Sequence, residues 1–239
     1  MERYRIAGLN VDMKVFGKTM LDQSEKYKVE NDGSAPDVTI NISEEKLMER
    51  MQKNGNAFAD LNTQEYMSTG AAFYVSLIKF NGLMLHSSAV VLDGKAYLFS
   101  APSGTGKSTH TSRWVSYFGS DRAFIINDDK PAIREMDGQF MVMGTPWSGK
   151  TAMNENVSVP AAAVAFIERS ETNRIERLTP AQALKHIMWQ TVRPTKEENM
   201  ERLLTTLDSF IRQVPVYKLY CNISDEAVQV AYEAMKEGK

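Results

Sequence analysis

The chain has 239 residues, and 28 Lys or Arg against 30 Asp or Glu give it a net charge of −2. This length accommodates one sizeable α/β domain with a small appendage and a substantial core. The near balance of charge, without a basic tract, argues against nucleic acid as a partner.

Compartment signals also come from composition and from the first residues. Cys221 is the single cysteine, so no internal disulfide can form, and no Cys/His cluster has zinc spacing. The start Met-Glu-Arg-Tyr-Arg lacks the apolar core of a signal peptide, and the apolar run 161–167 is too short to span a bilayer. We therefore expect a soluble cytoplasmic protein without a membrane partner.

The first part of the chain alternates short β-like pieces at 4–6 and 38–42 with charged turns such as 31–34. It contains no cluster of catalytic residue types. We interpret residues 1–62 as a small N-terminal α/β lobe and residues 63–239 as the main domain.

The main domain opens with a helix and a hairpin. Apolar residues at helical spacing predict a helix over 63–79, which the Asn-Gly pair at 81–82 ends and which we expect to pack beneath the main sheet. The segments 83–92 and 95–100 flank the Asp-Gly pair at 93–94, which predicts a β-hairpin.

The second hairpin strand leads into residues 101–109, Ala-Pro-Ser-Gly-Thr-Gly-Lys-Ser-Thr, and a helix is predicted to continue to 118. Strand, glycine-rich loop and helix in this order are typical of a phosphate-binding P-loop, although Ala101 replaces its usual first glycine. An ordinary Gly/Ser turn that caps a helix is the alternative. Lys107 would reach the β- and γ-phosphates of ATP, and the Ser108 hydroxyl would bind Mg²⁺.

We expect the side chain of Lys107 to face solvent until phosphate binds. The residues expected to hold the nucleotide are Ser103, Gly104, Thr105, Gly106, Lys107, Ser108 and Thr109.

An acidic pair follows the loop helix. The apolar strand 123–129 ends in Asp128 and Asp129, and a carboxylate in this position downstream of a P-loop is typical of a Mg²⁺ site in phosphoryl transfer. Two carboxylates so close can divide the roles of base and metal ligand between them. The sequence Asn-Asp-Asp-Lys-Pro is also typical of an Asx turn, which is the alternative interpretation.

The rest of the chain mixes hairpins with helices, so we expect an α/β fold with a mixed sheet. The predicted elements are a hairpin of 132–135 and 139–143, a loop at 144–150, a strand at 159–168, helices at 181–188 and 197–213, a strand at 216–219, and a last helix capped at 224.

Several further side chains have both a functional and a structural interpretation. His86, on the strand that pairs with the P-loop strand, is either catalytic or a hydrogen-bonded structural residue. Trp147, Ser148 and Lys150 either line a pocket or form a rigid turn with Trp147 in the core. Arg193 and Arg113 either contact phosphate or lie on the surface.

Taken in order, the His86 strand, the Ser-Gly-Thr-Gly-Lys-Ser loop and the strand end at Asp128 and Asp129 resemble the C-terminal domain of HPr kinase/phosphorylase. That family shares the fold of the ATP-dependent phosphoenolpyruvate carboxykinases. The resemblance covers about 83–129 and, more diffusely, the remainder of the chain. Asn127 stands where the family has a further acidic residue.

The resemblance implies a kinase that transfers the γ-phosphate of ATP to a serine of a protein or peptide. By this resemblance Asp128 would be the base, Asp129 and Ser108 would serve Mg²⁺, and His86 would lie near the γ-phosphate. A regulatory module that binds ATP or ADP without transfer, and a small-metabolite kinase, remain as alternatives. The sequence leaves the acceptor and any homo-oligomer open.

Overall fold

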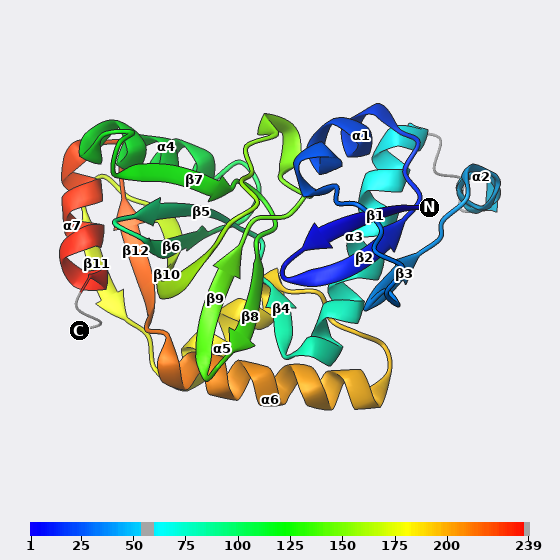
Figure 1. Ribbon diagram of the computed structural model, residues 1–239. Coiled ribbons are helices and arrows are strands. Elements are labelled where there is room, and N and C mark those ends of the chain that lie inside the picture. The colour runs from blue at the N-terminus through cyan, green and yellow to red at the C-terminus, as the bar shows by residue number, and fades with distance from the viewer. Residues whose placement is uncertain (54–59, 237–239) are drawn as a thin grey trace.

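The structure is a computed structural model that describes residues 1–53 and 60–236. Within these residues the strands form a three-stranded sheet and a nine-stranded mixed sheet (Figure 1). The small sheet has the order β1 (Glu2–Ile6), β2 (Leu9–Met13) and β3 (Val38–Ile40). The large sheet runs in the order β4 (Gly82–Met84), β8 (Ala132–Met136), β9 (Gln139–Met143), β10 (Ser158–Arg169), β6 (Lys95–Ser100), β5 (Ser87–Leu92) and β7 (Ala123–Asn127), with β12 (Val216–Cys221) beside β10 and β11 (Arg174–Arg177) beside β12.

Strand β10 organises the large sheet because it pairs with three neighbours along its length. Its first residues run antiparallel to β9, and its remaining residues run parallel to β6 on one side and to β12 on the other. The other pairings of the large sheet are antiparallel. The predicted mixed α/β fold is therefore confirmed.

Helices cover both faces of the large sheet (Figure 1). Helices α4 (Lys107–Phe118) and α7 (Asp225–Met235) bury Trp114, Ala227 and Val228 with one face, whereas α5 (Pro180–Gln190) and α6 (Glu197–Gln213) bury Ile187 and Leu207 with the other. No described helix has the length and apolar character needed to cross a membrane.

The helix starts follow the predicted caps. The Thr179 hydroxyl accepts from the Gln182 amide in a capping box with Pro180 in the first turn, and the Ser224 hydroxyl accepts from the Ala227 amide. Both predicted Asp-Gly hairpins also form: Asp93 and Gly94 have φ of 49° and 76° between β5 and β6. Residues with positive φ at both turn positions are those that a tight hairpin requires.

The N-terminal part contains elements that the sequence analysis missed, namely β2, α1 (Lys18–Ser24) and α2 (Glu44–Lys53). Helix α3 (Leu61–Leu77) packs against the small sheet and β4 rather than beneath the centre of the large sheet. Its Phe73 and Tyr74 share one apolar cluster with Tyr4 and with Trp147. The predicted boundary between residues 62 and 63 stays a prediction.

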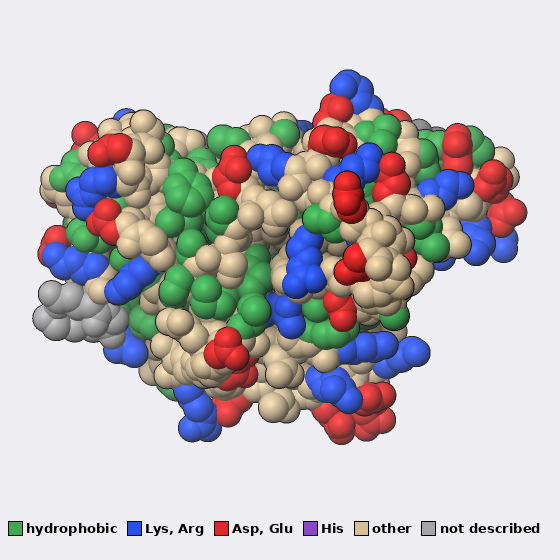
Figure 2. All heavy atoms as spheres, in the orientation of Figure 1, with side chains coloured by type: hydrophobic (Ala, Val, Ile, Leu, Met, Phe, Trp, Pro, Cys, Tyr) green, Lys and Arg blue, Asp and Glu red, His purple; other side chains and the backbone are tan. Residues whose placement is uncertain are grey.

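Charged side chains are intermixed on the face shown in Figure 2, where basic and acidic groups alternate over the described residues. Hydrophobic side chains gather to the left of the centre of the same face.

The predicted segment 83–92 is divided into β4 and β5, because β4 pairs with β8 whereas β5 pairs with β6 and β7. The break lies at Leu85 and His86 and brings His86 to the end of the sheet.

Candidate functional site

Two glycines of the loop between β6 and α4 have empty space beside their Cα atoms. Gly104 and Gly106 have φ of 80° and 119°, in the region that favours glycine, and a Cβ added at either would meet no atom within 4 Å. Gly106 is the N-cap of α4 and gives no side-chain hydrogen bond to the first turn. The amides at the start of α4 therefore point toward the space in front of the loop, which suits an anion.

Lys107 is not solvent-facing, contrary to our expectation. Its side chain is buried, and its Nζ donates to the carbonyl of Ala101 at 3.0 Å. Burial lowers the pKa of Lys107, while the carboxylates of Asp129 and Asp128 oppose that change. A backbone carbonyl of the loop thus binds the loop's own lysine, and the ammonium group of that lysine faces Asp128 and Asp129.

Asn127 forms the Asx turn that the sequence allowed. Its Oδ1 accepts from the amides of Asp129 and Lys130 at 3.0 and 2.8 Å, and its Nδ2 donates to the Thr145 carbonyl at 3.0 Å. Because Asn127 satisfies the turn, the two carboxylates beyond it are left for other partners. The Asx turn is therefore confirmed at Asn127, and a catalytic or metal-binding role of Asp128 and Asp129 stays a prediction.

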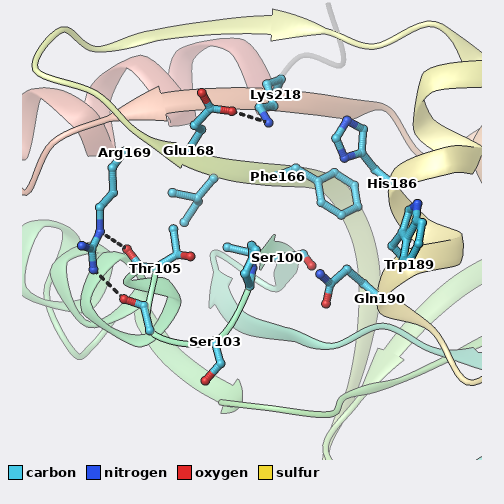
Figure 3. A pocket seen from close by; sticks show the side chains of 14 residues that line it. Ser100, Ser103, Thr105, Phe166, Glu168, Arg169, His186, Trp189, Gln190 and Lys218 are labelled. Atoms are coloured by element: carbon cyan, nitrogen blue, oxygen red, sulfur yellow. Dashed lines mark hydrogen bonds and ion pairs between the residues drawn. The ribbon is translucent and has the colours of Figure 1, made fainter.

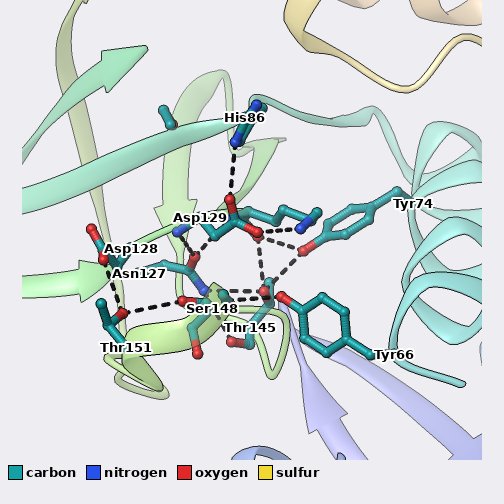
Figure 4. Close-up of polar contacts among 12 residues, drawn as sticks. Tyr66, Tyr74, His86, Asn127, Asp128, Asp129, Thr145, Ser148 and Thr151 are labelled. Carbon is teal, nitrogen blue, oxygen red and sulfur yellow. Dashed lines mark hydrogen bonds and ion pairs between the residues drawn. The ribbon is translucent and has the colours of Figure 1, made fainter. Parts of the chain in front are cut away.

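Asp128 is held by uncharged hydroxyl groups. Ser88 Oγ donates to its Oδ1 at 2.6 Å, and Thr151 Oγ1 donates to its Oδ2 at 2.9 Å. Ser88 in turn contacts Thr111 of α4 at 2.7 Å. The carboxylate is thereby fixed between β5, which contacts the helix that follows the loop, and the segment after β9. Figure 4 shows its contact with Thr151.

Asp129 is held by His86 and Lys130 instead. His86 Nε2 lies 3.0 Å from its Oδ1, and Lys130 Nζ contacts its Oδ2. Burial alone would raise the pKa of Asp129, but the hydrogen bond from His86 and the charge of Lys130 outweigh it and lower the pKa to about 2. The Nδ1 of His86 meets Gln190 Oε1 at 3.1 Å, and its backbone amide donates to the Gln190 carbonyl at 2.8 Å.

A cavity of about 320 Å³ brings these groups together. Of the residues predicted for the site, Thr105 alone lies outside this lining. The predicted residues that line the cavity are His86, Ser103, Gly104, Gly106, Lys107, Ser108, Thr109, Asp128 and Asp129. The residue before β5, the 101–106 loop, the start of α4 and the residues that follow β7 thus meet at one place.

The oxygen atoms of this cavity suit a hard cation. Among the described residues, no group of three or more His, Cys, Asp or Glu could hold a metal by itself. Mg²⁺ is usually bound by one or two carboxylates together with substrate phosphates. The hydroxyl of Ser108 and the carboxylates of Asp128 and Asp129 therefore fit Mg²⁺ that arrives with a nucleotide.

In the loop after β9, Trp147 lies in the core, as one of the two interpretations of the sequence predicted. This side chain is fully buried, stacks on Phe73 with ring centroids 4.9 Å apart, and donates to Thr69 Oγ1 at 3.1 Å. Ser148 is also buried, yet it lines the cavity together with Lys150.

The two arginines considered for phosphate contact lie outside this cavity. Arg193 is exposed, with its guanidinium 5.7 Å from the ring of Trp189. Arg113 pairs with Asp225 at 2.6 Å and lines a neighbouring cavity.

Arg169 is the main residue that the sequence analysis missed. It ends β10, and its guanidinium donates to the carbonyls of Gly104 and Thr105. Its position at the carboxyl end of a strand parallel to the loop strand was the available signal. Gln190, which holds His86, carries no comparable signal because it lies at the end of a helix far along the chain.

Two larger cavities border the loop on either side of Arg169. One, of about 700 Å³, reaches from Gly106 and Thr109 to Arg113 and Ile223. The other, of about 780 Å³, lies between the loop and α5 (Figure 3). Thr105 lines both, and Gly104 lines all three cavities.

Comparison with known proteins gives one family. Among solved structures, "Structure of the Hpr(Ser) kinase/phosphatase from Coxiella burnetii" is similar at 13% identity and a TM-score of 0.34, covering 63% of this chain and 94% of that chain. No curated protein matches significantly. The predicted membership of the HPr kinase group stays a prediction. The model of a family described as "SynChlorMet cassette protein ScmC" matches residues 57–230, which is most of the sequence, and the chain therefore belongs to this family.

Proposed function

We propose that the protein is an ATP-dependent kinase that transfers the γ-phosphate to a serine-like hydroxyl of a protein or peptide. The observation that carries the proposal is the 320 Å³ cavity, in which the lysine of a glycine-rich loop faces two carboxylates. One carboxylate is held by hydroxyl groups and the other by His86 and Lys130. Phosphoryl transfer needs positioning and neutralisation of charge more than covalent chemistry by the protein.

The nucleotide phosphates bind in front of the 101–106 loop in this proposal. Phosphate replaces the Ala101 carbonyl as the partner of Lys107 Nζ, and the uncapped first turn of α4 supplies amide donors. The nucleoside extends into the 700 Å³ cavity, because that cavity shares Gly106 and Thr109 with the phosphate site.

Mg²⁺ bound with the nucleotide would be held by Ser108 and Asp129 and would supply positive charge against the phosphates. Asp129 suits that role because the hydrogen bond from His86 and the charge of Lys130 lower its pKa, which favours the ionised carboxylate. His86, directed at Asp129, would lie near the γ-phosphate.

Asp128 is the general base in this proposal. Its partners Ser88 and Thr151 donate neutral hydrogen bonds, whereas His86 and Lys130 contact Asp129 directly and lower the pKa of that carboxyl. It would take the proton of the acceptor hydroxyl as the oxygen attacks the γ-phosphorus and the bond to the β–γ bridging oxygen breaks. ADP leaves with the electron pair of that bond.

The test is transfer from labelled ATP to short synthetic peptides that contain serine. Asp128→Asn should keep affinity for ATP with Mg²⁺ within a few-fold and lower transfer by about 10²–10⁴. Asp137→Asn, in the exposed turn between β8 and β9, is the matched control because Asn tolerates the positive φ of 51° there.

Two results would contradict the proposal of a protein or peptide kinase. If wild-type protein binds ATP but transfers phosphate to no serine peptide and to no small hydroxyl compound, a regulatory nucleotide-binding module takes its place. If small hydroxyl compounds alone are phosphorylated, the protein is a metabolite kinase.

A further inference from the structure

The 780 Å³ cavity has no role in holding the nucleotide as proposed above. Its walls are the 100–105 segment, the carboxyl end of β10, Lys218 of β12 and the last turn of α5 (Figure 3). It meets the 320 Å³ cavity at Ser103 and Gly104, which line both. A group bound here therefore lies beside the phosphate site, on the side opposite α4.

An exposed indole marks the rim of this cavity. Trp189 is 71% exposed, whereas Trp114 and Trp147 are fully buried. Tryptophan combines a large apolar surface with few rotatable bonds, and it is enriched among residues that dominate binding energy. An indole exposed at the mouth of a cavity offers its apolar surface to an occupant.

The chemistry of the walls favours an uncharged occupant. The ring centroids of Phe166 and His186 lie 4.9 Å apart, and burial together with the charge of nearby Lys218 lowers the pKa of His186, which disfavours its charged form. Lys218 is paired with Glu168 at 2.8 Å, and Arg169 is engaged with the loop carbonyls. Because these charges already have partners, the cavity offers aromatic surface rather than a free cation for a phosphate or carboxylate.

The cavity is also linked to His86, through Gln190. Gln190 lines it, and the same residue holds His86 through its carbonyl and its side chain. Trp189 and Gln190 are consecutive, so an occupant that contacts the indole lies next to the residue that orients His86.

We propose that the 780 Å³ cavity binds an aromatic or large aliphatic side chain of the peptide segment that carries the acceptor serine. This inference rests on the proposed kinase function and adds a specificity site to it. A volume of this size is typical of a ligand pocket and exceeds what a serine side chain fills.

The experiment uses a positional-scanning library of short synthetic peptides with a central serine and one other position fixed in turn. Transfer from labelled ATP is measured for the full-length wild type, for Trp189→Ala and for Leu184→Ala. Leu184 is the matched control because it is an exposed apolar residue of α5 that does not line the cavity.

The wild type and Leu184→Ala should both select Phe, Tyr, Trp or Leu at one position near the serine. Trp189→Ala should lose this selection and raise the KM for the selected peptide by about 10-fold, with the Kd for ATP changed much less. A structural defect in the variant would change both the KM for the peptide and the Kd for ATP, whereas loss of the specificity site changes mainly the KM.

Four results overturn the inference. Transfer without preference at any position, or a preference that Trp189→Ala leaves unchanged, removes the specificity site while the kinase function stands. Selection of acidic residues at the affected position contradicts the apolar occupant. No transfer by the wild type to any peptide contradicts the kinase proposal and removes this inference with it.

Discussion

Replacing Asp129 by Asn tests the ion pairs at the centre of the site. The pKa of this carboxyl falls from 3.8 to about 2 because His86 and Lys130 outweigh the effect of burial. Each pKa unit corresponds to about 1.4 kcal/mol, so ionised Asp129 stabilises the folded state by about 2 kcal/mol at neutral pH. In a chain of 239 residues this corresponds to a fall in melting temperature of about 4–8 °C for Asp129→Asn.

The sign of the pH dependence follows from the lowered pKa. The contribution is complete above the unfolded pKa of 3.8 and is lost as the pH falls through about 2, so the variant and the wild type should converge across that window. Urea unfolding at neutral pH and at several acidic pH values measures the difference, with Asp137→Asn as the exposed control. Equal stability of Asp129→Asn and wild type at neutral pH would refute the reasoning.

Three other variants probe the loop, the metal and the core. Lys107→Ala should weaken ATP binding by about 1.5–3 kcal/mol in calorimetry, because a charge-assisted contact is lost; an unchanged Kd would exclude the loop as the phosphate site. Asp129→Ala should raise the Mg²⁺ concentration at which ATP increases thermal stability, and an unchanged requirement would move the ligand role to another residue. Trp147→Ala should lower the free energy of unfolding by about 3–5 kcal/mol in urea titration, because its fully buried ring stacks on Phe73; a loss below 1 kcal/mol would contradict that packing.

Local signals in the sequence were sufficient for the hairpins and for several helices. The Asp-Gly pairs adopt the positive φ angles that tight hairpins need, and Thr179 and Ser224 cap the helices that they precede. The strand predicted over 123–129 is present as β7, but it ends at Asn127, so Asp128 and Asp129 lie after the strand and not at its last two positions.

Features that depend on contacts between distant segments could not be predicted. The break at His86 arises because β4 and β5 pair with different strands, a choice that no local pattern records. The burial of Lys107 depends on its hydrogen bond to the Ala101 carbonyl. The contact between Gln190 and His86 joins positions 104 residues apart. Helix α1 has seven residues, too few to show helical periodicity, whereas β2 does alternate apolar and polar residues and could have been identified from the sequence.

The hydrogen bond from Lys107 to Ala101 has a consequence for anion selectivity. An empty loop whose lysine already has a carbonyl partner is not a general trap for anions, because an incoming group must compensate for the bond it displaces. A single sulfate or inorganic phosphate supplies few additional contacts, whereas a polyphosphate chain also meets the backbone amides along the loop and at the start of α4. The self-bonded lysine would therefore make the site discriminate by the length of the phosphate chain rather than by negative charge alone.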